Sequence, residues 1–283
     1  MERISRGFRL LGASWEVLKA DRELMLLPVF SFLALLAVAG TLFAAAWGVG
    51  LPHNGESPTV FHYFLIALFY FVSYFIGIFF NAAVVGAAMI RLNGGDPTLR
   101  DGIKAASDKI GKIAGWAAVA ASVGLVLRAL EERAGFLGRI VIAIVGAAWS
   151  AVTFFVVPIL LFEPLGVVDS VKRSGSLFKQ RWGEQFVGNV SIGLAMMILS
   201  LPVILLAVAI GAAVVPLGIA VGVLGMGILS AAGGAMSGIF NAALYRFATT
   251  GTASGPFSED DLRGAFRPRR GRSRGIGGFS GPL

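Results

Sequence analysis

Residues 185–245 read QFVGNVSIGLAMMILSLPVILLAVAIGAAVVPLGIAVGVLGMGILSAAGGAMSGIFNAALY, a run of 61 residues without Asp, Glu, Lys or Arg. A helix needs about 20 apolar residues to cross the hydrocarbon core of a bilayer, so this run can hold two long spans or three short ones. The whole chain is similar, since 56% of its 283 residues are hydrophobic and only 14% are charged. Soluble domains average about 25% charged residues. The composition therefore predicts a protein embedded in a lipid bilayer.

Four further uncharged runs indicate the other spans: Leu24–Pro52, Ser57–Ile90, Ile113–Leu127 and Ile140–Phe162. The third run contains only 15 residues. It spans the core only if Lys112 and Arg128 extend their charged groups to the two interfaces. With the longest run broken at Pro216-Leu217-Gly218, the predicted spans lie at about 24–48, 60–90, 112–129, 139–162, 185–211 and 217–247.

The distribution of basic residues favours six spans over seven. With six spans, 21 of the 24 Lys and Arg residues fall on one side of the membrane, and seven of these lie in the C-terminal tail. A seventh span would move the tail to the other side and spoil this asymmetry. Because Lys and Arg are enriched in cytoplasmic segments, we expect both termini to be cytoplasmic. The predicted location is the cell (inner) membrane of a bacterium.

Each odd-numbered span is preceded by a charged segment with helical periodicity, at about 3–20, 98–112 and 166–183. Apolar residues such as Trp15 in the first segment and Val168 in the third follow one stripe, and basic residues lie off it. An apolar stripe with basic flanks, next to a span, is typical of an amphipathic helix that lies in the membrane interface.

These segments also suggest an internal repeat. Each contains the pattern Ser-x-x-φ-x-Lys, where φ is apolar, beginning at Ser14, Ser107 and Ser174. The first and third copies are 160 residues apart, and so are the Phe-Asn-Ala-Ala sequences at 80–83 and 240–243. Two features at one offset favour a repeat. We therefore predict an all-α polytopic membrane protein with six transmembrane helices in three parallel hairpin repeats, each preceded by a cytoplasmic amphipathic interfacial helix.

The chain divides into a six-span membrane domain, residues 1–250, and a basic tail, residues 251–283. Most of the tail is rich in Arg, Gly and Ser and is predicted to be disordered. Because it is tethered at the membrane surface, anionic lipid is a better expected partner for it than RNA. The lipid-contacting candidates are Arg269, Arg270, Arg272 and Arg274.

Three polar residues are candidates for contacts within the membrane. Asn81 and Asn241 lie among small residues, where an amide usually forms a hydrogen bond to a neighbouring helix. The alternative is that both amides contact a solute in a cavity between the repeats. Glu163 follows the helix-kinking Pro158 and is expected to pair with Arg91 or with the Lys172-Arg173 pair.

The sequence contains little material for catalysis. It has no Cys, and its two His residues, His53 and His62, lie with Glu56 in a spacing that matches no helix-borne zinc motif. The six span centres carry no ionisable residue, which argues against ion-coupled transport. We therefore predict no catalytic, cofactor-binding or metal-binding residue, no cofactor, and a protein that is not an enzyme.

One stretch resembles known families. Residues 157–164 (VPILLFEP), followed by residues 170–179 (SVKRSGSLFK), resemble uncharacterised prokaryotic polytopic membrane families. In these families a span ends in Pro-x-x-x-x-Glu and continues into a basic amphipathic helix, with Trp commonly at the position of Gly175. The layout as a whole is similar to six-span actinobacterial families of unknown function, and this resemblance implies no activity.

The first functional hypothesis is a multi-pass inner-membrane protein of scaffold, regulatory or lipid-organising type, without catalytic activity. The alternative is an uncoupled channel or permease for a small or lipidic solute. The expected partners are membrane lipids, mainly anionic ones, with a homo-oligomer or another membrane protein as further candidates. Nucleic acid is not expected.

Overall fold

The computed structural model describes residues 2–49, 59–181, 187–259 and 262, and the regular structure in these ranges is helical. Its long helices alternate with short ones. The elements are α1 (Glu2–Ala20), the 3₁₀ helix η1 (Arg22–Met25), α2 (Leu26–Val49), α3 (Val60–Leu92), α4 (Leu99–Ser107), α5 (Ile110–Arg133), α6 (Phe136–Val152), α7 (Val156–Phe162), α8 (Val167–Arg181), α9 (Val187–Ala213) and α10 (Val215–Thr250).

Six helical segments of the described chain are long and apolar enough to cross a membrane. The first combines η1 with α2, and the fourth combines α6 with α7 across a short break. The others are α3, α5, most of α9, and α10. The predicted all-α class and the number of spans are confirmed. The short third span is resolved by length, because α5 continues through Lys112 and Arg128 to Arg133.

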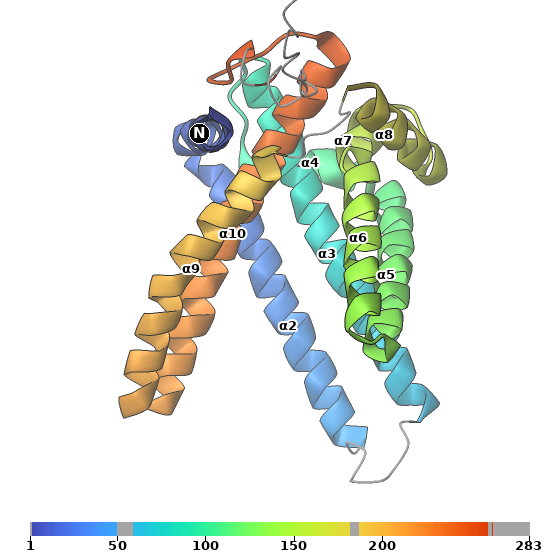
Figure 1. Ribbon diagram of the computed structural model, residues 1–283, viewed down its shortest axis with the longest axis vertical. Helices are drawn as coiled ribbons and strands as arrows, with labels where there is room; N and C mark the ends of the chain where they lie inside the picture. Colours follow the sequence, from blue (N-terminus) through green and yellow to red (C-terminus); the bar gives the residue numbers. More distant parts are fainter. Residues whose placement is uncertain (1, 50–58, 182–186, 260–261, 263–283) are drawn as a thin grey trace, which may run out of the picture.

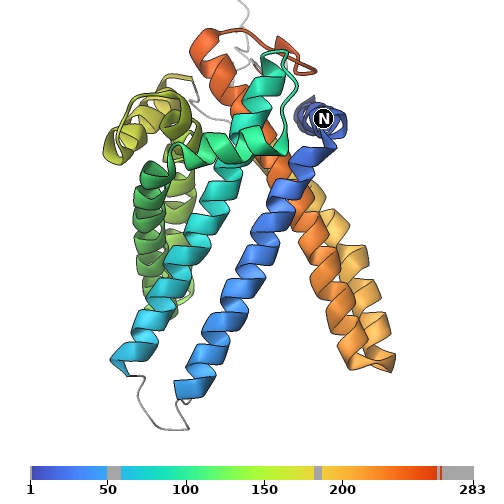
Figure 2. The ribbon, with the colours of Figure 1, turned by 180° about the vertical axis from the view of Figure 1, so that it is seen from behind.

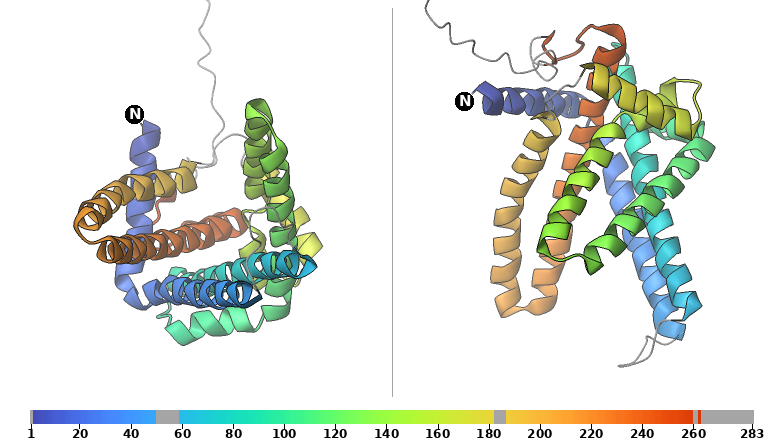
Figure 3. Two further views of the ribbon diagram at one scale, coloured as in Figure 1. Left: turned by 90° about the horizontal axis from the view of Figure 1, so that it is seen from below. Right: turned by 45° about the vertical axis from the view of Figure 1, so that its right-hand side comes forward.

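The long helices form three successive pairs, α2 with α3, α5 with α6, and α9 with α10. The pairs converge at the end where α1, α4, α8 and the C-terminal end of α10 lie, and they spread apart towards the other end (Figures 1 and 2). The short helices lie across the direction of the spans, as the right-hand view of Figure 3 shows for α1. Each pair therefore leaves this end and returns to it.

The core lies where the pairs converge, and both Phe-Asn-Ala-Ala copies contribute to it. Ala82 and Ala83 of α3 and Phe240 and Ala242 of α10 are buried. A Cβ atom added to Gly238 would lie 2.6 Å from Val84 Cγ1, so α3 and α10 cross closely there. Small residues permit such close approach between helices in a membrane, where tight packing drives their association.

The three serine patterns do not have equivalent surroundings. Ser14 and Ser174 are fully buried, whereas Ser107 is exposed at the last position of α4. The predicted helix at 98–112 is divided, because the chain turns at Asp108 and Lys109 before α5 begins at Ile110. The internal repeat therefore stays a prediction.

Two of the short helices bury one face against the bundle and expose large apolar residues on another. The buried residues are Leu10, Ser14 and Val17 of α1, and Ser170, Ser174 and Leu177 of α8. Trp15 of α1 remains 39% exposed and Val168 of α8 remains 64% exposed, although both belong to the apolar stripes of the sequence. Part of each predicted stripe thus faces away from the protein.

Candidate functional site

The fourth span is broken where it enters the core. The predicted span at 139–162 is not continuous, because α6 ends at Val152 and α7 begins at Val156. Ser174 of α8 bridges the break: its hydroxyl donates to the Val152 carbonyl at 2.5 Å and accepts from the Phe155 N–H at 3.0 Å. Backbone groups freed inside a membrane protein need such partners, since no water replaces them.

Asn241 supplies a second partner at this break. Its Nδ2 donates to the carbonyl oxygen of Phe154 at 3.0 Å. In a continuous helix that carbonyl would accept from the residue four positions later, which is Pro158 and has no N–H. Asn241 thus replaces a hydrogen bond that Pro158 cannot make, and this contact corresponds to the interhelical alternative for this residue.

We expect Asn241→Leu to lower the free energy of unfolding by about 1–3 kcal/mol, because the buried Phe154 carbonyl loses its donor. In a Pro158→Ala background the cost should be smaller, since position 158 then carries its own N–H for that carbonyl. Thermal or SDS-induced unfolding of the purified protein, measured for the four variants of this double-mutant cycle, tests the coupling. An equal cost of Asn241→Leu in both backgrounds contradicts it.

Glu163 lies at the end of α7 in a compensated environment. Arg173 of α8 forms an ion pair with it at 3.3 Å, and the Tyr245 hydroxyl of α10 donates to Oε1 at 3.1 Å. Lys112 of α5 donates to its backbone carbonyl oxygen at 3.5 Å. Of the expected partners, Arg173 is the one in contact, so this carboxylate joins α7, α8 and α10.

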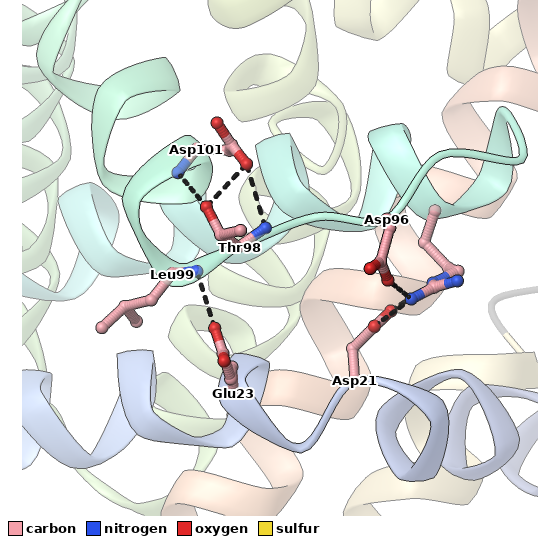
Figure 4. Close-up of polar contacts among 7 residues, drawn as sticks. Asp21, Glu23, Asp96, Thr98, Leu99 and Asp101 are labelled. Atoms are coloured by element: carbon pink, nitrogen blue, oxygen red, sulfur yellow. Dashed lines mark hydrogen bonds and ion pairs between the residues drawn. The ribbon is translucent and has the colours of Figure 1, made fainter.

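Arg91, the other expected partner, pairs elsewhere (Figure 4). Its guanidinium forms hydrogen bonds to both carboxylate oxygens of Asp21, between α1 and η1, and an ion pair to Asp96 at 2.5 Å. Next to it, Glu23 accepts from the Leu99 N–H at 3.2 Å. These contacts join the start of the first span to the end of α3 and the start of α4.

Thr98 begins α4 through a reciprocal pair of contacts with Asp101, also drawn in Figure 4. The Thr98 hydroxyl accepts from the Asp101 N–H at 3.2 Å, and the Asp101 carboxylate accepts from the Thr98 N–H at 3.0 Å and from its hydroxyl at 2.6 Å. The hydroxyl hydrogen bond is the main cause that holds the pKa of Asp101 below its ordinary value. This capping box fixes the point where the chain turns into α4.

Asn81 has a different setting from Asn241. It lines a cavity of about 210 Å³ between α2, α3 and α10, together with Ser31 and Ser230. The cavity is otherwise apolar, with Phe32, Leu35 and Phe80 among its walls. The structure therefore does not bring the two amides to one cavity: Asn81 lines the space between α2, α3 and α10, whereas Asn241 reaches the break in the fourth span.

Several predicted contact residues lie outside the described residues. These are the tail arginines Arg269, Arg270, Arg272 and Arg274, and also His53 and Glu56. His62 is described, and its ring Nδ1 lies 2.7 Å from the Thr59 hydroxyl at the start of α3. Within the described ranges no group of three His, Asp or Glu residues could hold a metal ion.

The sequence analysis did not identify Ser174 and Tyr245 as contact residues. Ser174 was recognised only as part of a repeated pattern, and Tyr245 only as the end of the uncharged run. A signal existed for the first: a span interrupted near a proline needs hydrogen-bond partners for its freed backbone groups, and a serine on the following helix can provide them.

Six long apolar helices, joined by short charged ones at one end, define a polytopic membrane protein. The chain belongs to the family of unknown function DUF6159, which it matches over residues 60–255. The match includes Asn81, Glu163 and Asn241. The expected resemblance to a membrane family of unknown function is confirmed to this extent, and the actinobacterial assignment stays a prediction. Neither a curated protein nor a solved structure has significant similarity to the chain.

Proposed function

We propose that the protein is a scaffold or regulatory component that organises lipid at the cytoplasmic face of a bacterial inner membrane, without catalytic activity. The observation that carries the proposal is the gathering of α1, α4 and α8 at one end of the helix pairs (Figure 1). All three helices carry basic residues. Anionic lipids attract such residues when they lie close to the membrane surface.

The exposed apolar side chains of these helices support an interfacial position. Trp15 and Val168 face away from the bundle, and Lys19 Nζ lies 5.6 Å from the centre of the Trp15 ring. At an interface the aromatic ring would enter the boundary between headgroups and acyl chains, while the adjacent lysine would meet the phosphates. In this proposal both termini are cytoplasmic, and self-association of the chain would enlarge the basic surface.

Neutralising the tail arginines tests this proposal. We expect the variant with Gln in place of Arg269, Arg270, Arg272 and Arg274 to lose much of the enrichment of phosphatidylglycerol around the protein. Each basic residue near an anionic surface contributes about 1 kcal/mol, and the contribution falls as salt rises. Electron paramagnetic resonance of spin-labelled phosphatidylglycerol and phosphatidylcholine in reconstituted vesicles measures the enrichment.

The matched control replaces Arg133 and Arg139, which lie at the opposite end of the helix pairs, with Gln. This control should leave the enrichment unchanged if the basic end of the molecule is responsible. An unaltered lipid preference in the tail variant would remove the tail from the proposal. The same result after neutralisation of Lys19, Lys104 and Lys172 would overturn the proposal itself.

The cavity beside Asn81 favours a second candidate function, an uncoupled permease for a small or lipidic solute. Its walls combine one amide and two serines with apolar side chains, a lining that suits an amphiphile. An assay of transbilayer movement of fluorescent lipid in proteoliposomes separates the candidates. Protein-dependent movement supports the permease, and retention of lipid in its leaflet supports lipid organisation.

A further inference from the structure

A large cavity lies at the end of the molecule away from α1, α4 and α8. Helices α2, α3 and α5 enclose about 710 Å³ there, between apolar and aromatic residues that include Phe43, Leu65 and Phe69. Three polar side chains, Tyr70, Arg128 and Glu132, stand along one part of its wall. The cavity therefore has an apolar body and one concentrated polar edge.

The polar edge is an arranged pair of opposite charges. Arg128 Nη1 donates to the Tyr70 hydroxyl at 2.6 Å, and Arg128 Nε donates to Glu132 Oε1 at 3.1 Å. A guanidinium has five N–H groups and a carboxylate has two oxygens, so both retain further hydrogen-bonding capacity beyond these contacts. Both side chains are also largely exposed, which leaves them accessible to a ligand.

The apolar body continues towards the membrane centre. A second cavity of about 490 Å³ between α2 and α3 shares Ala39, Phe69 and Tyr70 with the first. Together they follow α3 from His62 to Tyr74, about 18 Å of helix at 1.5 Å per residue. One leaflet of the hydrocarbon core is about 15 Å thick. The groove is therefore long enough for one acyl chain.

We propose that this groove binds a single phospholipid with a phosphoethanolamine headgroup, its phosphate at Arg128, its ammonium at Glu132, and an acyl chain along α2 and α3. Charge complementarity selects this headgroup, because the site offers one cation and one anion side by side. An anionic headgroup without an ammonium group would leave the Glu132 carboxylate facing the lipid phosphate. A choline headgroup carries no N–H and cannot donate to Glu132.

This inference rests on the proposed lipid-organising function for its purpose, but it concerns the opposite end of the molecule and a different lipid. Its experiment therefore uses other residues and another readout. The protein is reconstituted in nanodiscs with equal amounts of phosphatidylethanolamine, phosphatidylcholine and phosphatidylglycerol, and native mass spectrometry identifies the lipid that remains bound after ejection from the disc. We expect one retained phosphatidylethanolamine per chain.

Substitutions at the polar edge test the headgroup assignment. Arg128→Gln should reduce retained phosphatidylethanolamine about tenfold, since hydrogen bonds to a charged group are lost. Glu132→Gln should abolish the preference for phosphatidylethanolamine over phosphatidylcholine while leaving some lipid bound. Arg139→Gln, a neighbouring cation outside the cavity lining, is the matched control and should behave as wild type.

Substitutions in the groove test the acyl-chain position. Ala39→Phe should exclude the lipid, because Ala39 lines both cavities, whereas Ala37→Phe changes an exposed residue outside both linings and should not. Equal retention of the three lipids by wild type, or an equal loss in Arg128→Gln and Arg139→Gln, would overturn the proposal. A failed tail experiment with an intact phosphatidylethanolamine preference would overturn only the basic-face function.

Discussion

The Arg91→Gln variant is expected to lose about 2–3 kcal/mol of stability, one of the two largest effects predicted for this chain. The side chain of Asp21 is only 6% exposed, and both of its carboxylate oxygens accept hydrogen bonds from Arg91. Without the guanidinium a nearly buried carboxylate loses its compensating charge. Breaking a fully buried pair costs about 3–5 kcal/mol, and the 29% exposure of Arg91 reduces that figure here.

The cycle Asp21→Asn, Arg91→Gln and the double variant tests this assignment. The double variant should be more stable than Arg91→Gln alone, because it removes the uncompensated charge as well as its partner. Lys104→Gln, which breaks the exposed ion pair with Asp108, is the control and should cost no more than about 0.5 kcal/mol. Unfolding in SDS, followed by circular dichroism, gives the four stabilities. An Arg91→Gln cost equal to that of Lys104→Gln contradicts the structural role.

The partner of Arg91 shows which parts of the structure the sequence could predict. Span number depends on length and apolar composition, which are properties of contiguous residues, and so it could be predicted. The choice between Glu163 and Asp21 as partner of Arg91 depends on how three distant segments pack, and one sequence contains no measure of that. The same limit explains Trp15, whose helical stripe was recognised but whose outward orientation was not.

The break in the fourth span lies between these two cases. Pro158 predicts a lost backbone hydrogen bond, and Asn241 predicts an interhelical contact, both from local chemistry. Their connection through the Phe154 carbonyl joins residues more than 80 positions apart in the chain. Local chemistry thus identifies what each residue needs, whereas the fold decides which residue meets that need.

The α9–α10 pair gives the second large prediction, because its two backbones approach most closely at Gly218. A Cβ atom added there would lie 2.6 Å from the Ala207 carbonyl oxygen and 2.6 Å from the Gly211 nitrogen, and it would also contact Gly211 Cα. All three are backbone atoms, so a side-chain rotation cannot relieve the contact. Gly218→Val must therefore separate the helices.

We expect Gly218→Val to cost about 3 kcal/mol or more, at the upper end of the range for overpacked sites, with Gly218→Ala intermediate. Gly40→Ala is the matched control, since Gly40 also lies in a span but its added Cβ would have no heavy atom within 4 Å. Thermal unfolding midpoints, with limited proteolysis to locate the opened segment, compare the three variants. Since small residues at this spacing bring helices together, equal midpoints for Gly218→Ala and Gly40→Ala would show that the pair tolerates a wider separation.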